Sequence, residues 1–104
     1  MKIYLDDERK APEGYVLYTT GEDMLEAIQK NPDMLKDCEE ISLDYQLCTQ
    51  LESRMSGEDV LKQLIQLHAN NVVDISDIRL EVHSKHPTKA REMRVMIRDF
   101  RWNK

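Results

Sequence analysis

Acidic side chains stand directly after two apolar segments that share one pattern. Asp6 and Asp7 follow Ile3-Tyr4-Leu5, and Asp44 follows Ile41-Ser42-Leu43. Carboxylates, water and phosphate oxygens are the usual ligands of Mg²⁺ in proteins. Adjacent carboxylates repel one another and are costly to bury, and a divalent cation relieves both problems. We therefore predict a Mg²⁺ site at Asp6, Asp7 and Asp44, where the metal would neutralise a phosphoryl oxygen and orient a nucleophile.

A simpler interpretation competes for each aspartate alone. Aspartate often caps a turn with its own carboxylate. For Asp6 or Asp7 considered singly, we favour turn capping. Only the three aspartates together, on matched segments, favour the metal site.

A third apolar segment ends in groups suited to proton transfer and phosphate binding. His83, Ser84 and Lys85 follow Ile78-Arg79-Leu80-Glu81-Val82. Imidazole exchanges protons near neutral pH, so His83 is a candidate acid or base, although a single histidine is more often packed or solvated. Ser84, Lys85 and the first amides of the following helix are predicted to bind phosphate. Arg9 is another candidate, because its guanidinium can bind phosphate through two hydrogen bonds.

Three parallel strands are needed to bring these groups together. Side chains alternate between the two faces of a strand, so the isoleucine and leucine of each segment share one face. Asp6, Asp44 and His83 then lie at the carboxyl ends, on the other face. If the strands are neighbours, these groups meet at the edge where open α/β sheets bind ligands. Arg79 and Glu81 face away from the apolar side, which predicts that the third segment is an edge strand.

The remaining elements follow from turn, capping and periodicity signals. Tyr15-Val16-Leu17-Tyr18 is a short β-prone run. Helices with apolar stripes are predicted to begin after Thr20, after Ser56 and near Pro87. Residues 46–55 are predicted to form a polar loop. The order β-β-α-β-α-β-α indicates a compact α/β layer fold with a mostly parallel sheet of about four strands, in one domain of residues 1–104.

Composition limits the cellular setting that we expect. The 104-residue chain has no apolar run of the roughly 20 residues that a membrane span requires. Asp6 and Asp7 interrupt the N-terminal apolar run, so no signal peptide is predicted. We expect a cytoplasmic protein without membrane attachment. Cys38 and Cys48 have no zinc-type spacing; free thiols are favoured, although a disulfide stays open.

Charge is distributed unevenly along the chain. The net charge is −5, but residues 1–84 carry 8 Lys/Arg against 18 Asp/Glu, and residues 85–104 carry 7 against 2. This basic end is either a solvated helix face or a flank that attracts a phosphate-bearing ligand. The arginines of the last helix lie outside its apolar stripe and are expected to face solvent or a partner: Arg91, Arg94, Arg98 and Arg101.

In combination, these motifs resemble a known family. Residues 5–12 (Leu-Asp-Asp-Glu-Arg-Lys-Ala-Pro), Leu43-Asp44, residues 57–61 (Gly-Glu-Asp-Val-Leu) and residues 82–84 (Val-His-Ser) are similar to cyclic-phosphate-processing receiver domains. The resemblance spans nearly the whole chain. It implies a receiver-like three-layer sandwich in which acids bind Mg²⁺ and the serine contacts a phosphoryl group. The chain departs from the family pattern at residues 45–48, where Tyr-Gln-Leu-Cys replaces His-Asp-Leu-Gly.

The resemblance implies Mg²⁺-dependent processing of cyclic phosphate or phosphodiester ends on nucleotides or RNA. The candidate catalytic residues are then Asp44 and His83, and the candidate phosphate-binding residues are Arg9, Ser84 and Lys85. The departures at Tyr45 and Gln46 favour an alternative, a catalytically inactive receiver-like module that binds a nucleotide, RNA or protein partner. Phosphorelay signalling is not expected, because the helix after the first strand and the final strand with its lysine are missing.

Overall fold

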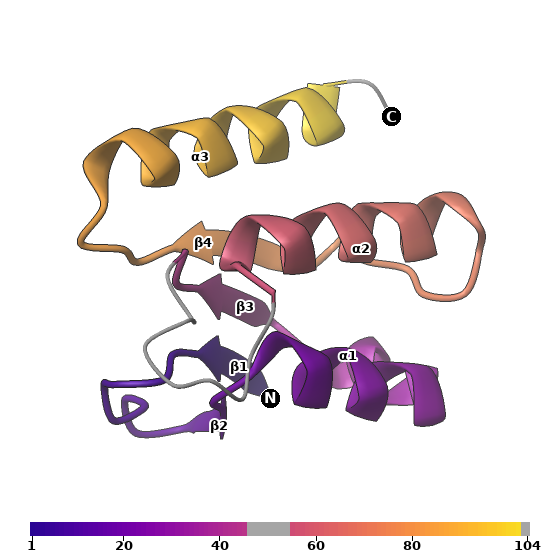
Figure 1. Cartoon of the computed structure of the whole chain (residues 1–104). Helices are drawn as coiled ribbons and strands as arrows, with labels where there is room; N and C mark the ends of the chain where they lie inside the picture. The colour runs from indigo at the N-terminus through magenta and orange to yellow at the C-terminus, as the bar shows by residue number, and fades with distance from the viewer. Residues whose placement is uncertain (46–54, 103–104) are drawn as a thin grey trace.

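The computed structural model describes residues 1–45 and 55–102 of the chain. The predicted order of strands and helices is confirmed, with a short 3₁₀ helix added over residues 32–37 (Figure 1). The elements are β1 (Lys2–Leu5), β2 (Tyr15–Tyr18), α1 (Gly21–Lys30), η1 (Pro32–Asp37), β3 (Glu40–Leu43), α2 (Gly57–Ala69), β4 (Arg79–Val82) and α3 (Pro87–Trp102).

Two of the predicted helix starts are capped by side chains. Thr20 Oγ1 accepts a hydrogen bond from the Asp23 amide at 3.1 Å, at the start of α1. Ser56 and Asp59 form a reciprocal capping box before α2, with distances of 3.2 Å and 3.1 Å. These bonds satisfy amides that have no partner within the helix. The short-range capping signals therefore set where these helices begin.

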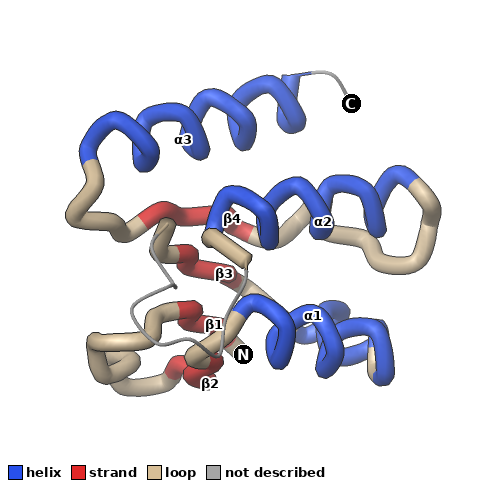
Figure 2. Tube along the Cα trace, viewed as in Figure 1, coloured by secondary structure: helices blue, strands red, loops and turns tan. Residues whose placement is uncertain are grey.

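The four strands form one parallel sheet in the order β2-β1-β3-β4 (Figure 2). Leu5 pairs with Leu43, and Leu43 pairs with Val82, so the three Ile-x-Leu-type segments lie side by side in matching register. The charged strand β4 is at an edge, as predicted. The register brings the three carboxyl ends to the same edge of the sheet.

One face of the sheet holds the apolar core. Its leucine, isoleucine and valine side chains pack against apolar residues of all three helices. The largest fully buried side chains are Ile3, Leu5, Met24, Ile28, Ile41, Leu43, Val60, Leu61, Leu64, Ile75 and Met93.

The third layer of the expected sandwich is absent from residues 1–45 and 55–102. Residues 6–14 contain no helix, and the crossovers through α1 and α2 step across the sheet in the same direction. Because such crossovers are right-handed, both helices lie on one face. The opposite face instead carries a polar network, in which Tyr15 donates to Glu40, and Arg79 pairs with Glu40 and with Glu81. These cross-strand pairs satisfy polar side chains on a face that no described helix covers, while Tyr4 and Ser42 on the same face are buried.

Two arginines of α3 differ from the expectation that they face only solvent or a partner. Arg94 donates to the Val82 carbonyl at 3.0 Å. Arg101 donates to the carbonyls of Ile75, Ser76 and Ile78. Both side chains therefore tie α3 to β4 and to the segment before it.

Two further observations bear on the sequence predictions. No helix among the described residues is long and apolar enough to cross a membrane. Cys38 is a buried free thiol that donates to the Glu40 carbonyl at 3.3 Å. Cys48 and most of the predicted polar loop lie outside the described residues.

Candidate metal and phosphate site

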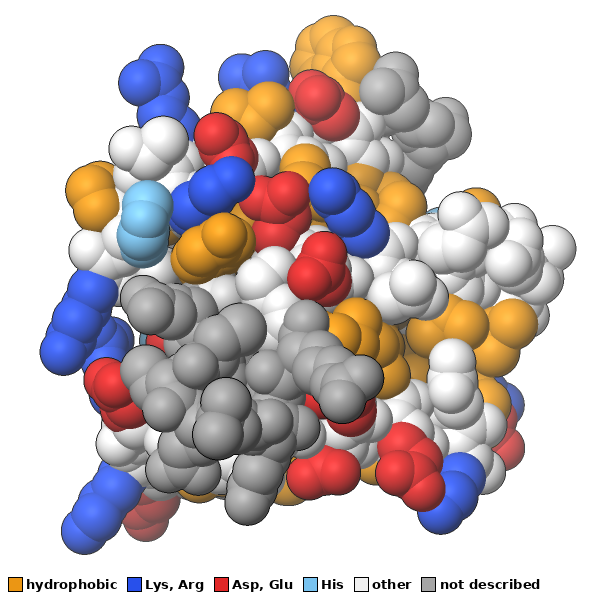
Figure 3. Space-filling view, viewed as in Figure 1, with side chains coloured by type: hydrophobic (Ala, Val, Ile, Leu, Met, Phe, Trp, Pro, Cys, Tyr) orange, Lys and Arg blue, Asp and Glu red, His pale blue; other side chains and the backbone are white. Residues whose placement is uncertain are grey.

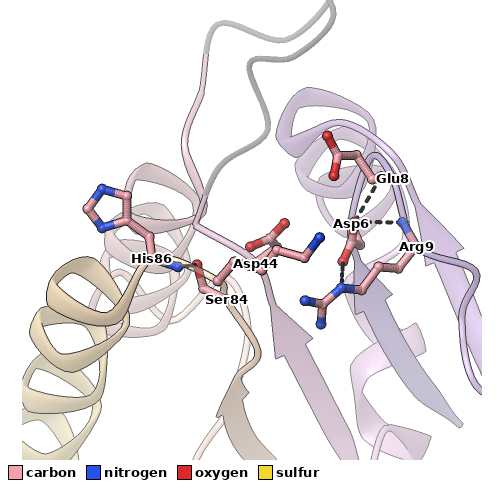
Figure 4. A pocket seen from close by; sticks show the side chains of 7 residues that line it. Asp6, Glu8, Arg9, Asp44, Ser84 and His86 are labelled. Carbon is pink, nitrogen blue, oxygen red and sulfur yellow. Dashed lines mark hydrogen bonds and ion pairs between the residues drawn. The ribbon is translucent and has the colours of Figure 1, made fainter.

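Backbone hydrogen bonds place the predicted site residues at neighbouring strand ends. The Asp6 amide donates to Tyr18, the Asp44 amide to Leu5, and the His83 amide to Leu43, at 3.1, 3.0 and 2.9 Å respectively. These bonds continue the parallel ladders just beyond the strands. Asp6, Asp44 and His83 are therefore held in one row across β1, β3 and β4. Figure 4 shows Asp6 and Asp44 at their neighbouring strand ends.

Asp6 is the most enclosed charged group of the site. Its side chain is 1 % exposed. Oδ1 accepts hydrogen bonds from the amides of Glu8 and Arg9 at 2.8 and 2.9 Å. Oδ2 faces His83 Nε2 at 3.1 Å and the Arg9 Nε at 4.0 Å. Asp6 thus does cap a turn, and the same turn aims its second oxygen into the site.

The three predicted metal ligands come together. One carboxylate oxygen from each of Asp6, Asp7 and Asp44 lies within 4.8 Å of the others. Burial raises the pKa of Asp44, and the negative charge of Asp6 raises it further, against the opposing effects of His83 and a hydrogen bond from Ser84. A hard divalent cation matches an all-oxygen ligand set and relieves this repulsion. The cluster can therefore hold a metal ion.

His83 lies behind the carboxylates with both ring nitrogens engaged. Nε2 faces Asp6, and Nδ1 lies 2.6 Å from Ser42 Oγ. The imidazole stacks on the Tyr4 ring with centroids 4.0 Å apart. Burial lowers the pKa of His83, although Asp6 and Asp44 oppose this effect. A carboxylate only accepts hydrogen bonds, so in a neutral ring the tautomer that fits both contacts donates from Nε2 to Asp6 and accepts from Ser42 at Nδ1.

A small pocket opens in front of Asp44, with a volume of about 120 Å³. It is smaller than the roughly 300–1,000 Å³ of typical small-molecule sites, so it suits an end group such as a phosphate. All three predicted phosphate ligands line it, whereas His83 does not. The lining residues are Asp6, Glu8, Arg9, Asp44, Ser84, Lys85 and His86.

The Ser84–Lys85 segment is shaped by a turn before α3. Ser84 Oγ accepts from the His86 amide at 3.1 Å, and the His86 carbonyl accepts from Ala90 at 2.9 Å. The start of α3 thus lies directly beside the pocket. In Figure 4 the His86 ring points away from the Asp44 carboxylate.

Gly57 allows the start of α2 to lie close to the end of β3. A Cβ atom at this position would lie 1.7 Å from the Asp44 carbonyl oxygen. The Gly57 amide also donates to the Tyr45 carbonyl at 2.7 Å. Only a residue without a side chain allows this approach.

Sequence reasoning did not assign roles to Ser42 and Tyr4, and it treated Gly57 only as part of a helix-start motif. Ser42 is 6 % and Tyr4 is 8 % exposed, and both contact the imidazole of His83. Strand alternation offered one signal, because Ser42 lies two residues before Asp44 and must share its face. The contact of Gly57 with Asp44 had no comparable signal.

Comparison with protein-family models matches residues 1–99 to the cyclic-phosphate processing receiver domain. The chain belongs to this family. Comparisons with curated proteins and with solved structures gave no match. The match covers the Asp6-Asp7, Asp44 and His83-Ser84 motifs on which the sequence resemblance was based.

Within this receiver-domain family, the chain departs from the expected pattern at Tyr45. Its ring contacts His86, with centroids 5.5 Å apart, and the Lys89 ammonium lies 5.6 Å from the ring centroid. Tyr45 therefore packs toward the start of α3 where the family pattern has histidine. The neighbouring departures at residues 46–48 lie outside the described residues.

Several basic side chains at the C-terminal end form ion pairs with acidic side chains of the same helix. Lys89 pairs with Glu92 at 3.1 Å, and Arg98 pairs with Asp99 at 3.6 Å. Figure 3 shows basic and acidic side chains next to one another over α2 and α3. Lys85 is the basic residue of this end that lines the pocket.

Proposed function

We propose that this receiver-family protein processes cyclic phosphate or phosphodiester ends on nucleotides or RNA with the help of Mg²⁺. The observation that carries the proposal is that two carboxylates of the three-aspartate cluster, Asp6 and Asp44, line one pocket together with the predicted phosphate ligands Arg9, Ser84 and Lys85. This arrangement combines a cation site with anion-binding groups, which is the combination that a phosphate ester needs. The family match supports the link to cyclic phosphates.

The pocket volume limits what part of a substrate is enclosed. About 120 Å³ accommodates a phosphoryl group, while the nucleoside would lie outside on the protein surface. Arg9 and Lys85 would hold the phosphate oxygens from opposite sides, and Ser84 would donate a hydrogen bond. A bound Mg²⁺ on Asp6, Asp7 and Asp44 would supply charge neutralisation and orient water.

We propose different roles for Asp44 and His83 in the reaction. Asp44 lines the pocket and would position the phosphate or a water molecule. His83 has both ring nitrogens engaged, by Asp6 and Ser42, so it would influence protons through Asp6 unless its hydrogen bonds rearrange.

A second candidate function is a non-catalytic module that binds a phosphate-bearing nucleotide, RNA or a protein partner through the same pocket. The hydrogen bonds at both ring nitrogens of His83 favour this binding module, because no described imidazole points at the pocket centre. Tyr45 favours it as well, since an aromatic ring replaces a proton-transfer residue of the family pattern.

The deciding experiment measures turnover of an oligonucleotide that ends in a 2′,3′-cyclic phosphate, with and without Mg²⁺. The native chain is compared with Asp44→Asn and with the control Asp33→Asn. Asp33 is 78 % exposed and does not line the pocket. Metal-dependent turnover that is lost only in Asp44→Asn supports the enzyme. Binding of the oligonucleotide without turnover supports the binding module.

A further inference from the structure

The two edge strands of the sheet, β2 and β4, differ in whether other residues bond to their outward backbone groups. In β4, the Arg79 amide donates to the Glu39 carbonyl of the chain preceding β3, so Arg79 and Glu81 turn their backbone groups inward. The carbonyls of Ile78 and Val82 therefore point outward. Arg101 and Arg94 of α3 donate to these two carbonyls and so protect both ends of the β4 edge, with Leu80 between them.

The edge at β2 has no such cover among residues 1–45 and 55–102. Tyr18 accepts from the Asp6 amide, so Tyr18 and Val16 turn their backbone groups toward β1. By alternation, Leu17 turns its N–H and C=O outward, and so does the Tyr15 carbonyl. The Tyr15 amide is already bonded to the Pro12 carbonyl at 3.1 Å. No described residue forms a hydrogen bond to the outward groups of Leu17.

The side chains of β2 are apolar where those of β4 are charged. Val16 is 42 % and Leu17 is 41 % exposed. Residues 14–21 contain no charged side chain, in a protein whose net charge is −5. Natural sheets usually protect an exposed edge with lysine, proline, a bulge or a covering element. The described part of β2 has none of these within its four residues.

The sequence of β2 is also self-complementary. A two-fold axis through Leu17 places Leu17 opposite its own copy, in a pair that exchanges two backbone hydrogen bonds. On the helix-bearing face, Val16 then comes opposite Tyr18 of the second copy. The Tyr15 carbonyl of one copy comes opposite the Thr19 amide of the other. Aromatic and β-branched side chains are favourable partners across antiparallel strands.

We propose that β2 pairs antiparallel with β2 of a second copy of this chain, so that two four-stranded sheets join into one. The absence of charge in residues 14–21 lets two acidic chains approach at this edge without repulsion between facing side chains. Four residues make a small contact, so the dimer dissociates on dilution. The dimer leaves the strand ends that carry Asp6 and Asp44 outside the contact and does not depend on the proposed activity.

Sedimentation of the full chain over about 10 µM to about 1 mM tests the proposal. The expected result is a shift toward twice the 12.3 kDa mass of one chain. Leu17→Lys places two lysines opposite each other and should weaken the dimer several-fold. The matched control is Val72→Lys, which adds the same charge at an apolar residue that is 43 % exposed outside the sheet, and it should leave the dimer intact.

Amide exchange of the native chain provides a test that needs no mutation. The Leu17 amide should exchange several-fold more slowly at the highest concentration than after dilution, because its N–H is bonded only in the dimer. A monomer at all concentrations overturns the proposal, and capture of an extended segment of another protein at β2 would then explain the open edge. A dimer that survives Leu17→Lys, or one without slowed Leu17 exchange, also overturns it.

Discussion

Asp6 and His83, which are 77 residues apart in the sequence, face each other with 3.1 Å between Oδ2 and Nε2. Asp6 is therefore shared between a candidate metal cluster and a half-buried imidazole. The Tyr4 ring stacks on the imidazole and Ser42 engages its other nitrogen. Asp44 also acts on the pKa of His83, so a charge that enters the pocket changes the field at the imidazole through both carboxylates.

Mg²⁺ should stabilise the native chain against thermal unfolding. A ligand that binds only the folded state stabilises it by about 2.7 kcal/mol at 100 times its Kd. In a domain of this size, that corresponds to a rise in Tm of roughly 10–20 °C. The rise should disappear in Asp44→Asn and persist in Asp33→Asn. An equal rise in both variants would contradict a metal site at Asp44.

Without metal, Asp44→Asn should be slightly more stable than the native chain at neutral pH. Burial and the charge of Asp6 raise the pKa of Asp44. The folded state therefore holds this proton more tightly than the unfolded state, and stability falls as pH rises through the folded-state pKa. Because Asp44 is partly exposed, we expect a gain of less than about 1 kcal/mol.

Chemical denaturation in the presence of a chelator measures this gain at pH 4 and at pH 7. The difference between the variant and the native chain should shrink as the pH falls toward the ordinary Asp value of 3.8, because Asp44 is then increasingly protonated in both states. A variant that is less stable at pH 7 would show that the Asp44 carboxylate is stabilising even without a cation.

His83 should make folding sensitive to mild acid. Burial lowers its pKa from the ordinary value of 6.5. The unfolded chain then takes up this proton first, so the stability is present above pH 6.5 and is lost as pH falls through the folded-state pKa. The unfolding midpoint of the native chain should fall over this window. His83→Gln, which cannot titrate, should flatten the pH dependence there, whereas an unchanged profile would assign it to other groups.

Gly57→Ala should damage the site although alanine is the better helix former. The new methyl group would meet the Asp44 carbonyl oxygen at 1.7 Å. Displacing α2 or the strand end should cost about 1–3 kcal/mol, which exceeds the gain of up to about 1 kcal/mol from helix propensity. Urea denaturation measures the loss, and the Mg²⁺-dependent rise in Tm should shrink. Gln63→Ala on the exposed side of α2 is the control that should leave both unchanged.

Local signals in the sequence determined the order of the elements and several of their boundaries. Thr20 and Ser56 start helices because each cap contacts an amide three residues away. The repeated Ile-x-Leu pattern predicted matched strands, since alternation in a strand is a property of consecutive residues. Those strands were enough to predict that Asp6, Asp7 and Asp44 meet.

The tertiary structure alone decided how these groups are partnered. Ser42 and His83 meet across 41 residues, and Arg101 reaches the Ile78 carbonyl across 23. Such contacts depend on how side chains of separate elements pack, which no short-range pattern encodes. The same is true of the one-sided sheet, because the face that the helices cover follows from the crossover direction. Sequence thus specified which groups arrive at the strand ends, and packing specified which of them point into the pocket.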